Sequence, residues 1–540
     1  MLPSVACKRR GHSTATKLHS DRGSAVEERP SPTTSPPMEP LPEAPLAPDK
    51  SARRGGTLRI QLEAEPPHLN PLHDALQVID RVVSGLVYET LLDCRGDQYH
   101  PGLADTWEVS PDGLRINMHL RSGPRWHDDK GFSVMDVQGT FEYLMRPSGR
   151  SAVLRAMLAD LEGVDVMPDR LVRFRLARPN GLVLRALCEV PILPGDPLRE
   201  GGQRLAQLGR SPLGTGPFRL AGWERGKRIK LVRSRASNAP DGPYLDEIIF
   251  EIDTDPARAL IRLRRGEIDI LPRVADVHYP EQVTRATLRD VLGLFRLMPN
   301  RYTFVALNTR RGVLADTAFR HALSLLWDRE RFAKTLHRGL VRPIGAPTFG
   351  TVPADKFDRA RAGQLLERAG FQDTDGDGVR DVGRAPIRMT FLVPAGSQTL
   401  AKEVHDYAMD LRRSGILLDT ATLDMATLLS RVEGGDFDMA ALTWEGRKDE
   451  DPRLLLTSQG DFQFTGYRPE KLTALVDLLR AAPDPAARAP LLSQLALTLG
   501  TDRPALFLYR HIVPMLASRR VHGLATVAGR LDLRSVWVDP

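Results

Sequence analysis

The amino-acid sequence predicts an α/β protein with two similarly built lobes. Two segments, ALIRLRRGEIDIL at residues 259–271 and TLLSRVEGGDFDMAAL at residues 427–442, share one pattern. In each, an amphipathic helix ends at glycine, as helix C-termini prefer, and an acidic and apolar alternating strand follows. The length of 540 residues leaves room for three or four domain-sized units. Because helix-to-strand turns commonly have this composition, the competing interpretation is that the two copies are unrelated.

The bulk composition is that of a soluble globular protein, with 41% hydrophobic and 26% charged residues. The net charge of +7 comes from 75 basic and 68 acidic residues that are interspersed along the chain. There is no basic stripe with interleaved aromatic residues, so we expect no nucleic-acid partner. No apolar run is long enough for a transmembrane helix.

Residues 1–54 are expected to form a disordered, proline-rich tether, because RPSPTTSPPMEPLPEAPLAP at residues 29–48 favours an extended, solvated chain. The small residues before Cys7, in SVAC, resemble the lipobox of a bacterial lipoprotein, which makes Cys7 a candidate lipid anchor. A signal would need a basic and then an apolar region before it, and only three residues precede the motif. Either the motif is a coincidence or the true start lies upstream.

The folded part is expected to open with a strand at residues 57–62 and a helix at residues 80–92. A hairpin is predicted at residues 107–120, where PDG forms the turn. A helix should begin at Ser133, with Asp136 completing a capping box. Further helices are predicted at residues 318–336, 360–369, 402–413 and 485–499, each with apolar residues at helical spacing.

The segment GGDFDMAALTW at residues 434–444 predicts a strand that ends at Trp444. A loop of dense charge follows, from Glu445 to Pro452. In open α/β sheets, ligands bind beyond the carboxyl ends of the strands, so an aromatic residue followed by charges is typical of a ligand-facing loop. A solvated surface turn is the competing interpretation.

DTDGDGVRD at residues 373–381 matches the first nine positions of a calcium loop, with Asp373, Asp375, Asp377 and Asp381 as the ligand candidates. The twelfth position, which should carry a bidentate glutamate, is Arg384. Both a structural turn and a calcium site fit this pattern.

No nucleophile elbow, HExxH, Walker A or CxxC motif is present, so the sequence predicts neither an enzyme nor a cofactor. The cluster WHDD at residues 126–129 is interpreted as a turn with a hydrogen-bonded histidine rather than a metal site. Two of the three cysteines, Cys7, Cys94 and Cys188, could form a disulfide, or all could be isolated thiols.

From residue 55 to the end, the chain resembles the family 5 solute-binding proteins of bacterial ABC importers, the oligopeptide-, dipeptide- and nickel-binding receptor type. The motifs that carry the resemblance occur in order: GGTLRI, LVYETLL, SPLGTGPFRLAGW, RRGEIDIL, DTDGDGVRD and GGDFDMAALTW. The resemblance implies a two-lobed, periplasmic-binding-protein-like fold (type II, cluster C) with an extra subdomain in lobe I. Lobe I would comprise residues 55–95, 205–297 and 505–540, the subdomain residues 96–204, and lobe II residues 298–504.

The resemblance also implies a ligand site between the lobes, with Trp444 stacking on the ligand and Tyr467 and Asn308 as polar contacts. Peptide binders of the family hold the ligand ammonium with an aspartate three residues after the tryptophan, but this chain has Arg447 there. The next carboxylate is Asp449, and Met425 replaces a usual pocket tryptophan. Since a cation repels an ammonium, either Asp449 takes over or the ligand is not a standard peptide.

These features predict an extracytoplasmic receptor, periplasmic or in the cell envelope and possibly lipid-anchored, that delivers a peptide-like solute to ABC permease and ATPase subunits. It is expected to be monomeric and to catalyse no reaction. The alternatives are a receptor for an anionic, N-blocked or metal-chelate solute, a carboxylate hydrolase, and a cytoplasmic solute sensor on the same fold.

Overall fold

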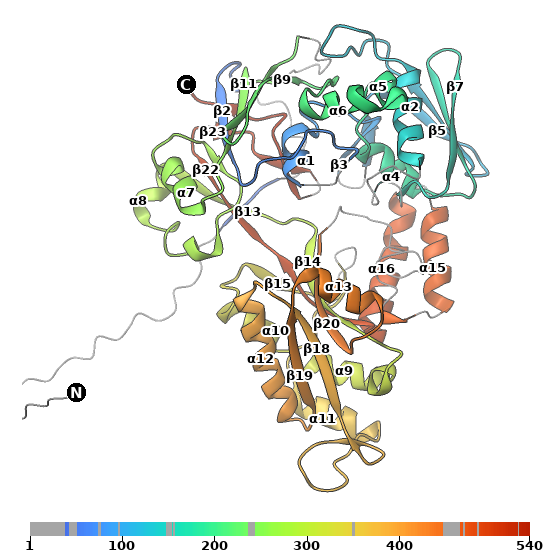
Figure 1. Cartoon of the computed structure of the whole chain (residues 1–540), viewed down its shortest axis with the longest axis vertical. Coiled ribbons are helices and arrows are strands. Elements are labelled where there is room, and N and C mark those ends of the chain that lie inside the picture. The colour runs from blue at the N-terminus through green and yellow to red at the C-terminus, as the bar shows by residue number, and fades with distance from the viewer. Residues whose placement is uncertain are drawn as a thin grey trace, which may run out of the picture. The chain divides into compact units, whose positions relative to one another are not determined.

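Two large mixed sheets organise the chain in the computed structural model (Figure 1). It describes residues 38–42, 51–73, 77–95, 98–146, 154, 157–235, 243–347, 352–445, 465–467, 470–482, 485–527 and 529–540. All elements named below belong to the unit Pro37–Pro540. None of their helices is both long and apolar enough to cross a bilayer.

The first sheet has eight strands in the order β1-β13-β22-β12-β2-β11-β10-β9. Strand β2 (Thr57–Leu62), the predicted first strand, has parallel neighbours on both sides, and Leu58, Ile60 and Leu62 are at most 1% exposed. The other strands are β1 (Glu39–Pro40), β9 (Phe218–Glu224), β10 (Arg228–Arg233), β11 (Glu247–Ile252), β12 (Ile270–Leu271), β13 (Leu292–Leu297) and β22 (Val513–Ser518).

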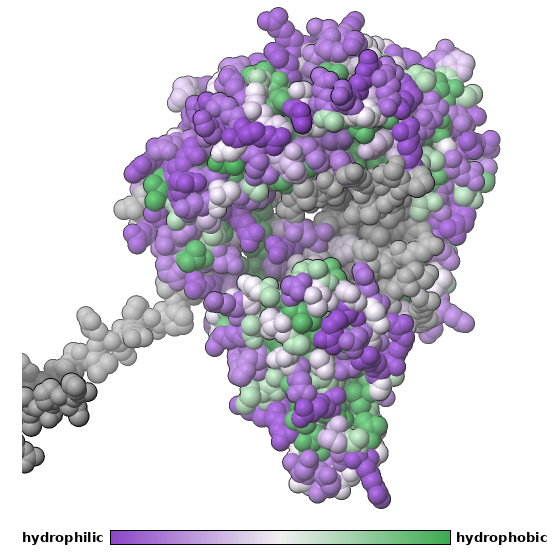
Figure 2. All heavy atoms as spheres, viewed as in Figure 1, coloured by the Kyte–Doolittle hydropathy of each residue, from purple (hydrophilic) through white to green (hydrophobic). Residues whose placement is uncertain are grey.

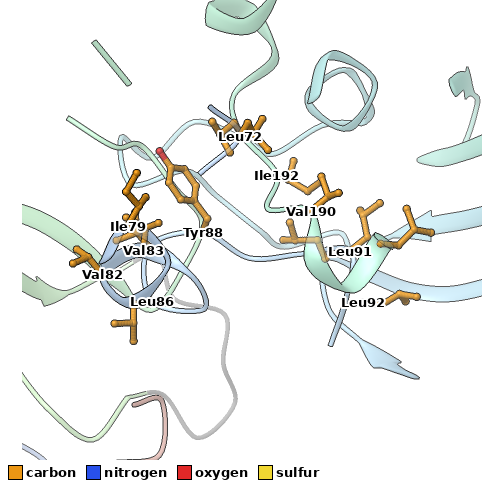
Figure 3. Close-up of a cluster of buried hydrophobic side chains, with 14 of the residues drawn as sticks. Leu72, Ile79, Val82, Val83, Leu86, Tyr88, Leu91, Leu92, Val190 and Ile192 are labelled. Carbon is orange, nitrogen blue, oxygen red and sulfur yellow. The ribbon is translucent and has the colours of Figure 1, made fainter. Parts of the chain in front are cut away.

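A short helix, α1 (Gln77–Val83), packs next to this sheet. Figure 3 shows its residues Ile79, Val82 and Val83 close to Leu86 and Tyr88. The predicted helix at 80–92 was therefore too long: Gly85 has a φ of +70°, which ends the helix, and residues 92–95 form strand β3 (Leu92–Arg95).

A four-stranded antiparallel sheet, β5-β6-β8-β7, forms a separate layer. Its hairpin, β5 (Ala104–Val109) and β6 (Arg115–Leu120), confirms the one predicted from PDG. The remaining elements here are β4 (Gln98–Pro101), β7 (Leu161–Met167), β8 (Leu171–Leu176), α2 (Val134–Met145), α4 (Leu182–Glu189), α5 (Gly195–Glu200) and α6 (Gly202–Arg210). The Ser133 N–H donates to Asp136 at 2.9 Å, as a capping box requires. A disulfide joins Cys94 of β3 to Cys188 of α4, which settles the cysteine alternative.

The six-stranded sheet has the order β15-β21-β14-β20-β18-β19. Along β14 (Arg301–Leu307), Tyr302, Phe304 and Ala306 face one hydrophobic core, and Val305 and Leu307 face another, so helices cover both faces. Its other strands are β15 (Val341–Pro343), β18 (Arg388–Pro394), β19 (Leu417–Leu423), β20 (Met439–Glu445) and β21 (Ala505–His511). Its helices are α9 (Thr317–Leu325), α10 (Arg329–Thr335), α11 (Arg359–Arg368), α12 (Gln398–Arg412), α13 (Met425–Glu433), α15 (Glu470–Ala481) and α16 (Pro485–Asp502).

Both predicted helix–glycine–strand units are confirmed, as α7 (Pro256–Arg264) before β12 and α13 before β20. The predicted helix at 318–336 is wrong, because α9 ends at Leu325 and α10 begins at Arg329. Asp328 caps the second helix by accepting a hydrogen bond from the Arg331 N–H at 3.1 Å. This break lets Trp327 point fully into the core.

Part of the predicted tether, residues 38–42, is not free chain. Glu39 and Pro40 pair in parallel with Phe295 and Arg296 at the edge of the eight-stranded sheet. The Pro42 carbonyl accepts a hydrogen bond from the Thr526 N–H at 2.9 Å. The sequence prediction missed this strand because a proline-rich composition is typical of an extended linker. Proline is nevertheless tolerated in a strand at the edge of a sheet.

The smaller elements are α8 (Ala286–Arg289), β16 (Asp381–Val382), β17 (Ala385–Pro386), β23 (Val521–His522), β24 (Ala525–Val527), β25 (Arg530–Asp532) and β26 (Trp537–Val538). On the face shown in Figure 2, most of the coloured surface is hydrophilic, and the hydrophobic spheres are scattered among it.

Candidate functional site

One edge of the six-stranded sheet collects the carboxyl ends of its parallel strands. Strands β18, β19 and β20 run parallel and end at Pro394, Leu423 and Glu445. Strand β14 is antiparallel to β20 and β21, so it begins at this edge with Arg301, and β21 ends there with His511. We call this the carboxyl edge. Ligands of open α/β sheets bind beyond such an edge.

The chain passes between the two large sheets at the carboxyl edge. Residues 298–300 connect β13 to β14, and Ile512 alone connects β21 to β22. The Arg510 guanidinium donates a hydrogen bond of 3.2 Å to the Met298 carbonyl, which ties the end of β21 to the first connection. The carboxyl edge is therefore the side of this sheet that leads to the eight-stranded sheet.

Trp444 and Met425, two of the predicted site residues, both lie at this edge. Trp444 is the penultimate residue of β20, lies opposite Tyr302 and is half-buried against a hydrophobic core. Met425 is the first residue of α13, directly after β19, and is 50% exposed. Its preceding residue, Asp424, caps the helix by accepting the Thr427 N–H at 3.0 Å, and hydrogen bonds from Thr427 lower the pKa of Asp424. Arg447 and Asp449 lie outside the described residues.

Asn308 and Tyr467 lie at the other end of the sheet. Asn308 follows β14 and is 2% exposed, and its amide donates to the Gly435 and Phe437 carbonyls at 3.2 and 3.1 Å. Five ladder positions separate the Leu307–Met439 pair from the Tyr302–Trp444 pair, which is about 17 Å at the rise of a strand. The Asn308 side chain thus holds two main-chain segments together. The prediction was that it would contact the ligand.

The surroundings of Tyr467 place it near Asn308. Its hydroxyl donates to the Asp502 carboxylate, and its N–H donates to the hydroxyl of Thr465 at 3.4 Å. The Thr465 carbonyl in turn accepts the N–H of Thr309 at 2.8 Å. Burial and the hydrogen bond to Asp502 raise the pKa of Tyr467. Of the four predicted site residues that the structure describes, Trp444 and Met425 lie at the carboxyl edge, and Asn308 and Tyr467 lie at the opposite end of the sheet.

Cationic side chains gather at the carboxyl edge, and sequence reasoning missed them. Arg301 begins β14, Arg342 lies on β15, and Arg510 and His511 end β21. Arg342 lies 41 residues after Arg301, and Arg510 lies 168 residues after Arg342. Only the strand register therefore reveals that they are neighbours. The signal available in the sequence was that Arg301 begins an apolar strand and that Arg510 and His511 end another.

The pKa values of Arg510 and His511, two basic residues at this edge, are both lowered. Burial lowers the pKa of Arg510, and the charge of Arg342 lowers it further. Burial also lowers the pKa of His511 to about 3, and the positive charges of Arg301, His337 and Arg273 add to this effect. The His511 ring lies 2.8 Å from the Thr303 hydroxyl. Of the described basic residues at this edge, the three arginines carry positive charge, whereas His511 is neutral at neutral pH.

The predicted calcium loop is an exposed turn. Asp373, Asp375 and Asp377 hold carboxylate oxygens within 4.8 Å of one another. The Asp373 carboxylate accepts the N–H groups of Gly376 and Gly378 at 2.7 and 2.9 Å, and these bonds lower the pKa of Asp373. Asp381 is buried and accepts the N–H and hydroxyl of Thr374. Main-chain hydrogen bonds thus account for the acidic residues as turn formers, and calcium binding stays a prediction.

The histidine of WHDD is hydrogen-bonded, as predicted. His127 Nε2 lies 2.9 Å from the Gly216 carbonyl, and Nδ1 accepts the Gly214 N–H at 3.3 Å. A Cβ at Gly214 would lie 1.7 Å from the Val87 carbonyl oxygen, so this turn needs glycine for close approach. Cys7, the candidate lipid anchor, lies outside the described residues.

Comparison with known proteins identifies the family of this chain. Residues 98–465 match the family of bacterial extracellular solute-binding proteins, family 5 middle. The dipeptide-binding protein of Escherichia coli (strain K12) is 24% identical over 467 residues, which are 78% of this chain and 83% of that protein.

Two solved structures share the fold. The oligopeptide-binding protein AppA from Bacillus subtilis, in complex with a nonapeptide, matches with a TM-score of 0.68 and 21% identity over 91% of this chain and all of that one. NikA from Brucella suis, in complex with Fe(III)-EDTA, matches with a TM-score of 0.77 and 20% identity over 90% and 100%. These matches confirm the predicted fold class, and the match over residues 98–465 shows that the chain belongs to the family 5 bacterial extracellular solute-binding proteins.

Proposed function

We propose that this chain is the substrate-binding receptor of an ABC importer and that it binds a peptide or peptide-like solute between its two lobes. The observation that carries this proposal is the position of Trp444 at the carboxyl edge, where both connections to the other sheet leave. The names of the relatives support the solute class, since one is a dipeptide-binding protein and another is an oligopeptide-binding protein.

In this proposal lobe I contains the eight-stranded sheet, lobe II contains the six-stranded sheet, and residues 96–204 form the extra subdomain. Strand pairing moves one boundary of the sequence prediction, because residues 505–511 are β21 of the six-stranded sheet. The lobes would move about residues 298–300 and Ile512, as hinges are a few residues at the ends of elements.

The receptor would bind without transforming its solute, and ATP hydrolysis would belong to partner subunits beside the permease. The relatives include a dipeptide-binding protein and a di/tripeptide-binding protein. We propose a periplasmic or cell-envelope location, with Cys7 as the lipid anchor and residues 8–37 as the tether.

A second candidate is a receptor for an anionic solute or a metal chelate. The cations at the carboxyl edge favour it. So does the structural likeness to NikA, whose structure holds Fe(III)-EDTA.

Native mass spectrometry of the purified full chain, followed by denaturation and identification of the released compounds, tests both candidates. Short peptides would support the first and a metal chelate the second. A Trp444→Ala variant should co-purify with several-fold less compound. A Trp223→Ala variant, changed on β9 of the other sheet, should behave like the wild type. Retention that is unchanged in Trp444→Ala would remove the carboxyl edge as the site.

A further inference from the structure

We propose that one end of the eight-stranded sheet, which we call the basic pole, docks on the surface of an anionic membrane. The basic pole consists of five exposed arginines and two exposed aliphatic residues, namely Arg264, Arg265, Arg285, Arg289 and Arg519 with Ile261 and Val291. This inference goes beyond the proposed function, because it concerns the surface on which the receptor rests and does not involve the solute.

The basic pole lies at the end of the eight-stranded sheet that is far from the connections to the other sheet. Strand β13 begins there and runs to residues 298–300. Strand β22 is antiparallel to β13 and to β12, so its last residue, Ser518, and the turn between α7 and β12 lie at the same end. Strand β13 has 6 residues, which span about 20 Å. A docked pole would therefore leave the carboxyl edge of the six-stranded sheet well away from the lipid.

Hydrogen bonds to main-chain carbonyls bring the arginines of the basic pole together. The Arg264 guanidinium donates to the Gln282 carbonyl, and Arg519 Nε donates to the Arg289 carbonyl at 2.7 Å. Arg285 and Arg289 are one helical turn apart along α8, so their side chains are neighbours. Segments that are distant in the sequence therefore present their arginines at one end of the sheet.

Most of the positive charge of the basic pole is not neutralised. Among the described residues, Arg265 is the one arginine of the five that pairs with a carboxylate, and its partner Glu267 lies 3.9 Å away. Glu267 also pairs with Arg262 at 3.2 Å. Asp290 is exposed and adds one more negative charge at the start of β13. Five arginines against these two carboxylates leave a net charge of +3.

Exposed aliphatic side chains lie among these charges. Ile261 is 46% exposed, and it precedes Arg264 and Arg265 by one helical turn, so it lies beside them on α7. Val291 is 54% exposed and follows α8. Figure 2 shows some hydrophobic spheres among hydrophilic ones over the part of the surface that Figure 1 labels α7 and α8. A basic surface with exposed aliphatic side chains is typical of binding at a membrane interface, whereas a soluble polyanion offers no apolar layer.

The amino-terminal tether joins the folded part at the same end. Strand β1 runs parallel to β13 with Glu39 opposite Phe295, so Met38 lies on the side of Glu39 that faces the basic pole. Met38 also packs against the hydrophobic core that α7 covers. If Cys7 carries a lipid, as proposed above, the tether brings the basic pole and the membrane together. The charge of the tether has the same sign at its start, since three basic residues follow Cys7 directly.

The net charge determines the size of the expected effect. A basic residue near an anionic surface strengthens binding about fivefold, so three such charges strengthen it about a hundredfold. The attraction falls off within a Debye length, which is about 10 Å at 0.1 M salt. Binding should therefore be strong on anionic vesicles, weak on neutral vesicles and sensitive to salt.

The test is sedimentation of the full chain with lipid vesicles. The chain carries Cys7→Ser, which removes the site of lipid attachment, so it binds only through its own surface. We expect it to bind vesicles that contain phosphatidylglycerol about tenfold to a hundredfold more tightly than vesicles of phosphatidylcholine alone. Inorganic phosphate should displace no more protein than chloride does at the same ionic strength. Equal binding to the two kinds of vesicle, or specific displacement by phosphate, would overturn the proposal.

Variants of the Cys7→Ser chain distinguish the basic pole from the tether and from the rest of the surface. The pole variant combines three substitutions of exposed arginines, Arg285→Gln, Arg289→Gln and Arg519→Gln. The control variant removes the same charge at exposed arginines of other elements, Arg115→Gln, Arg204→Gln and Arg388→Gln. The pole variant should bind anionic vesicles about tenfold or more weakly than the control variant. If the two variants bind equally, the basic pole does not dock.

A further variant tests the apolar part of the docking surface. Ile261→Ser combined with Val291→Ser keeps every charge and should weaken binding to anionic vesicles severalfold, because the aliphatic side chains then lose their contact with lipid. Unchanged binding would contradict that contact. No solute takes part in these experiments, so their failure would leave the proposed function standing, and a failure to find a solute would leave the docking surface standing.

Discussion

A buried ion pair between distant parts of the chain should be one of its most sensitive positions. Asp160 precedes β7 of the four-stranded sheet and is 3% exposed, and Arg480 on α15 is 6% exposed. The Arg480 guanidinium donates to the Asp160 carboxylate, and the Gly181 N–H donates to the Arg480 carbonyl at 2.6 Å. Since α15 packs on the six-stranded sheet, this contact joins two layers of the fold.

The expected effect of Asp160→Asn follows from what the carboxylate leaves behind. Asp160 also accepts hydrogen bonds from Arg178 at 3.0 Å and Asn180 at 2.8 Å, so one substitution weakens several charge-assisted bonds. Burial lowers the pKa of Arg480, which shows that its charge is poorly solvated there. Removing one partner of a buried pair costs about 3–5 kcal/mol, because the other charge stays buried without compensation.

The assay is the free energy of unfolding from urea titration of the full chain. The control is Asp165→Asn in the same sheet, where the carboxylate pairs with Arg175 at 2.9 Å but both side chains are 40% exposed or more. An exposed pair contributes about 0–1 kcal/mol, so the control should change stability little. Adding Arg480→Met to Asp160→Asn should restore about 1 kcal/mol or more, since it removes the stranded charge. Equal losses in Asp160→Asn and Asp165→Asn would refute this reasoning.

Three further predictions concern the disulfide, one histidine and the acidic turn. Reduction of the Cys94–Cys188 bond, whose ends are 94 residues apart, should lower stability by about 2–5 kcal/mol. A thiol titration of the unreduced, unfolded chain should find one thiol, that of Cys7, when the chain is produced without lipid, and none when Cys7 carries the lipid. The pKa of His511 falls from 6.5 unfolded to about 3 folded, so its contribution is complete above pH 6.5 and is lost as the pH falls toward 3. The urea midpoint should therefore drop more between pH 7 and pH 5 in the wild type than in His511→Asn, and equal drops would contradict the burial of this ring. If the loop at residues 373–381 is a structural turn, Asp381→Ala should lower the melting temperature and excess calcium should leave the wild type unchanged, whereas a calcium-dependent rise would establish a metal site.

Local sequence patterns predicted the elements whose boundaries depend on neighbouring residues. The hairpin at PDG and the capping box at Ser133 follow from short-range hydrogen bonds, and both were found. The errors occurred where local signals compete with packing. The helix through residues 318–336 has one continuous apolar pattern, but Asp328 caps a second helix inside it and Trp327 turns into the core.

The site was predictable only in part, because it is assembled by strand register. The position of Trp444 was predictable, since it comes at the end of an apolar strand before a charged loop. The position of Asn308 was not predictable, because the resemblance gave no information on which end of β14 it follows. Arg342 and Arg510 were missed because no local pattern indicates that β15 and β21 pair, and their proximity exists only in the folded sheet.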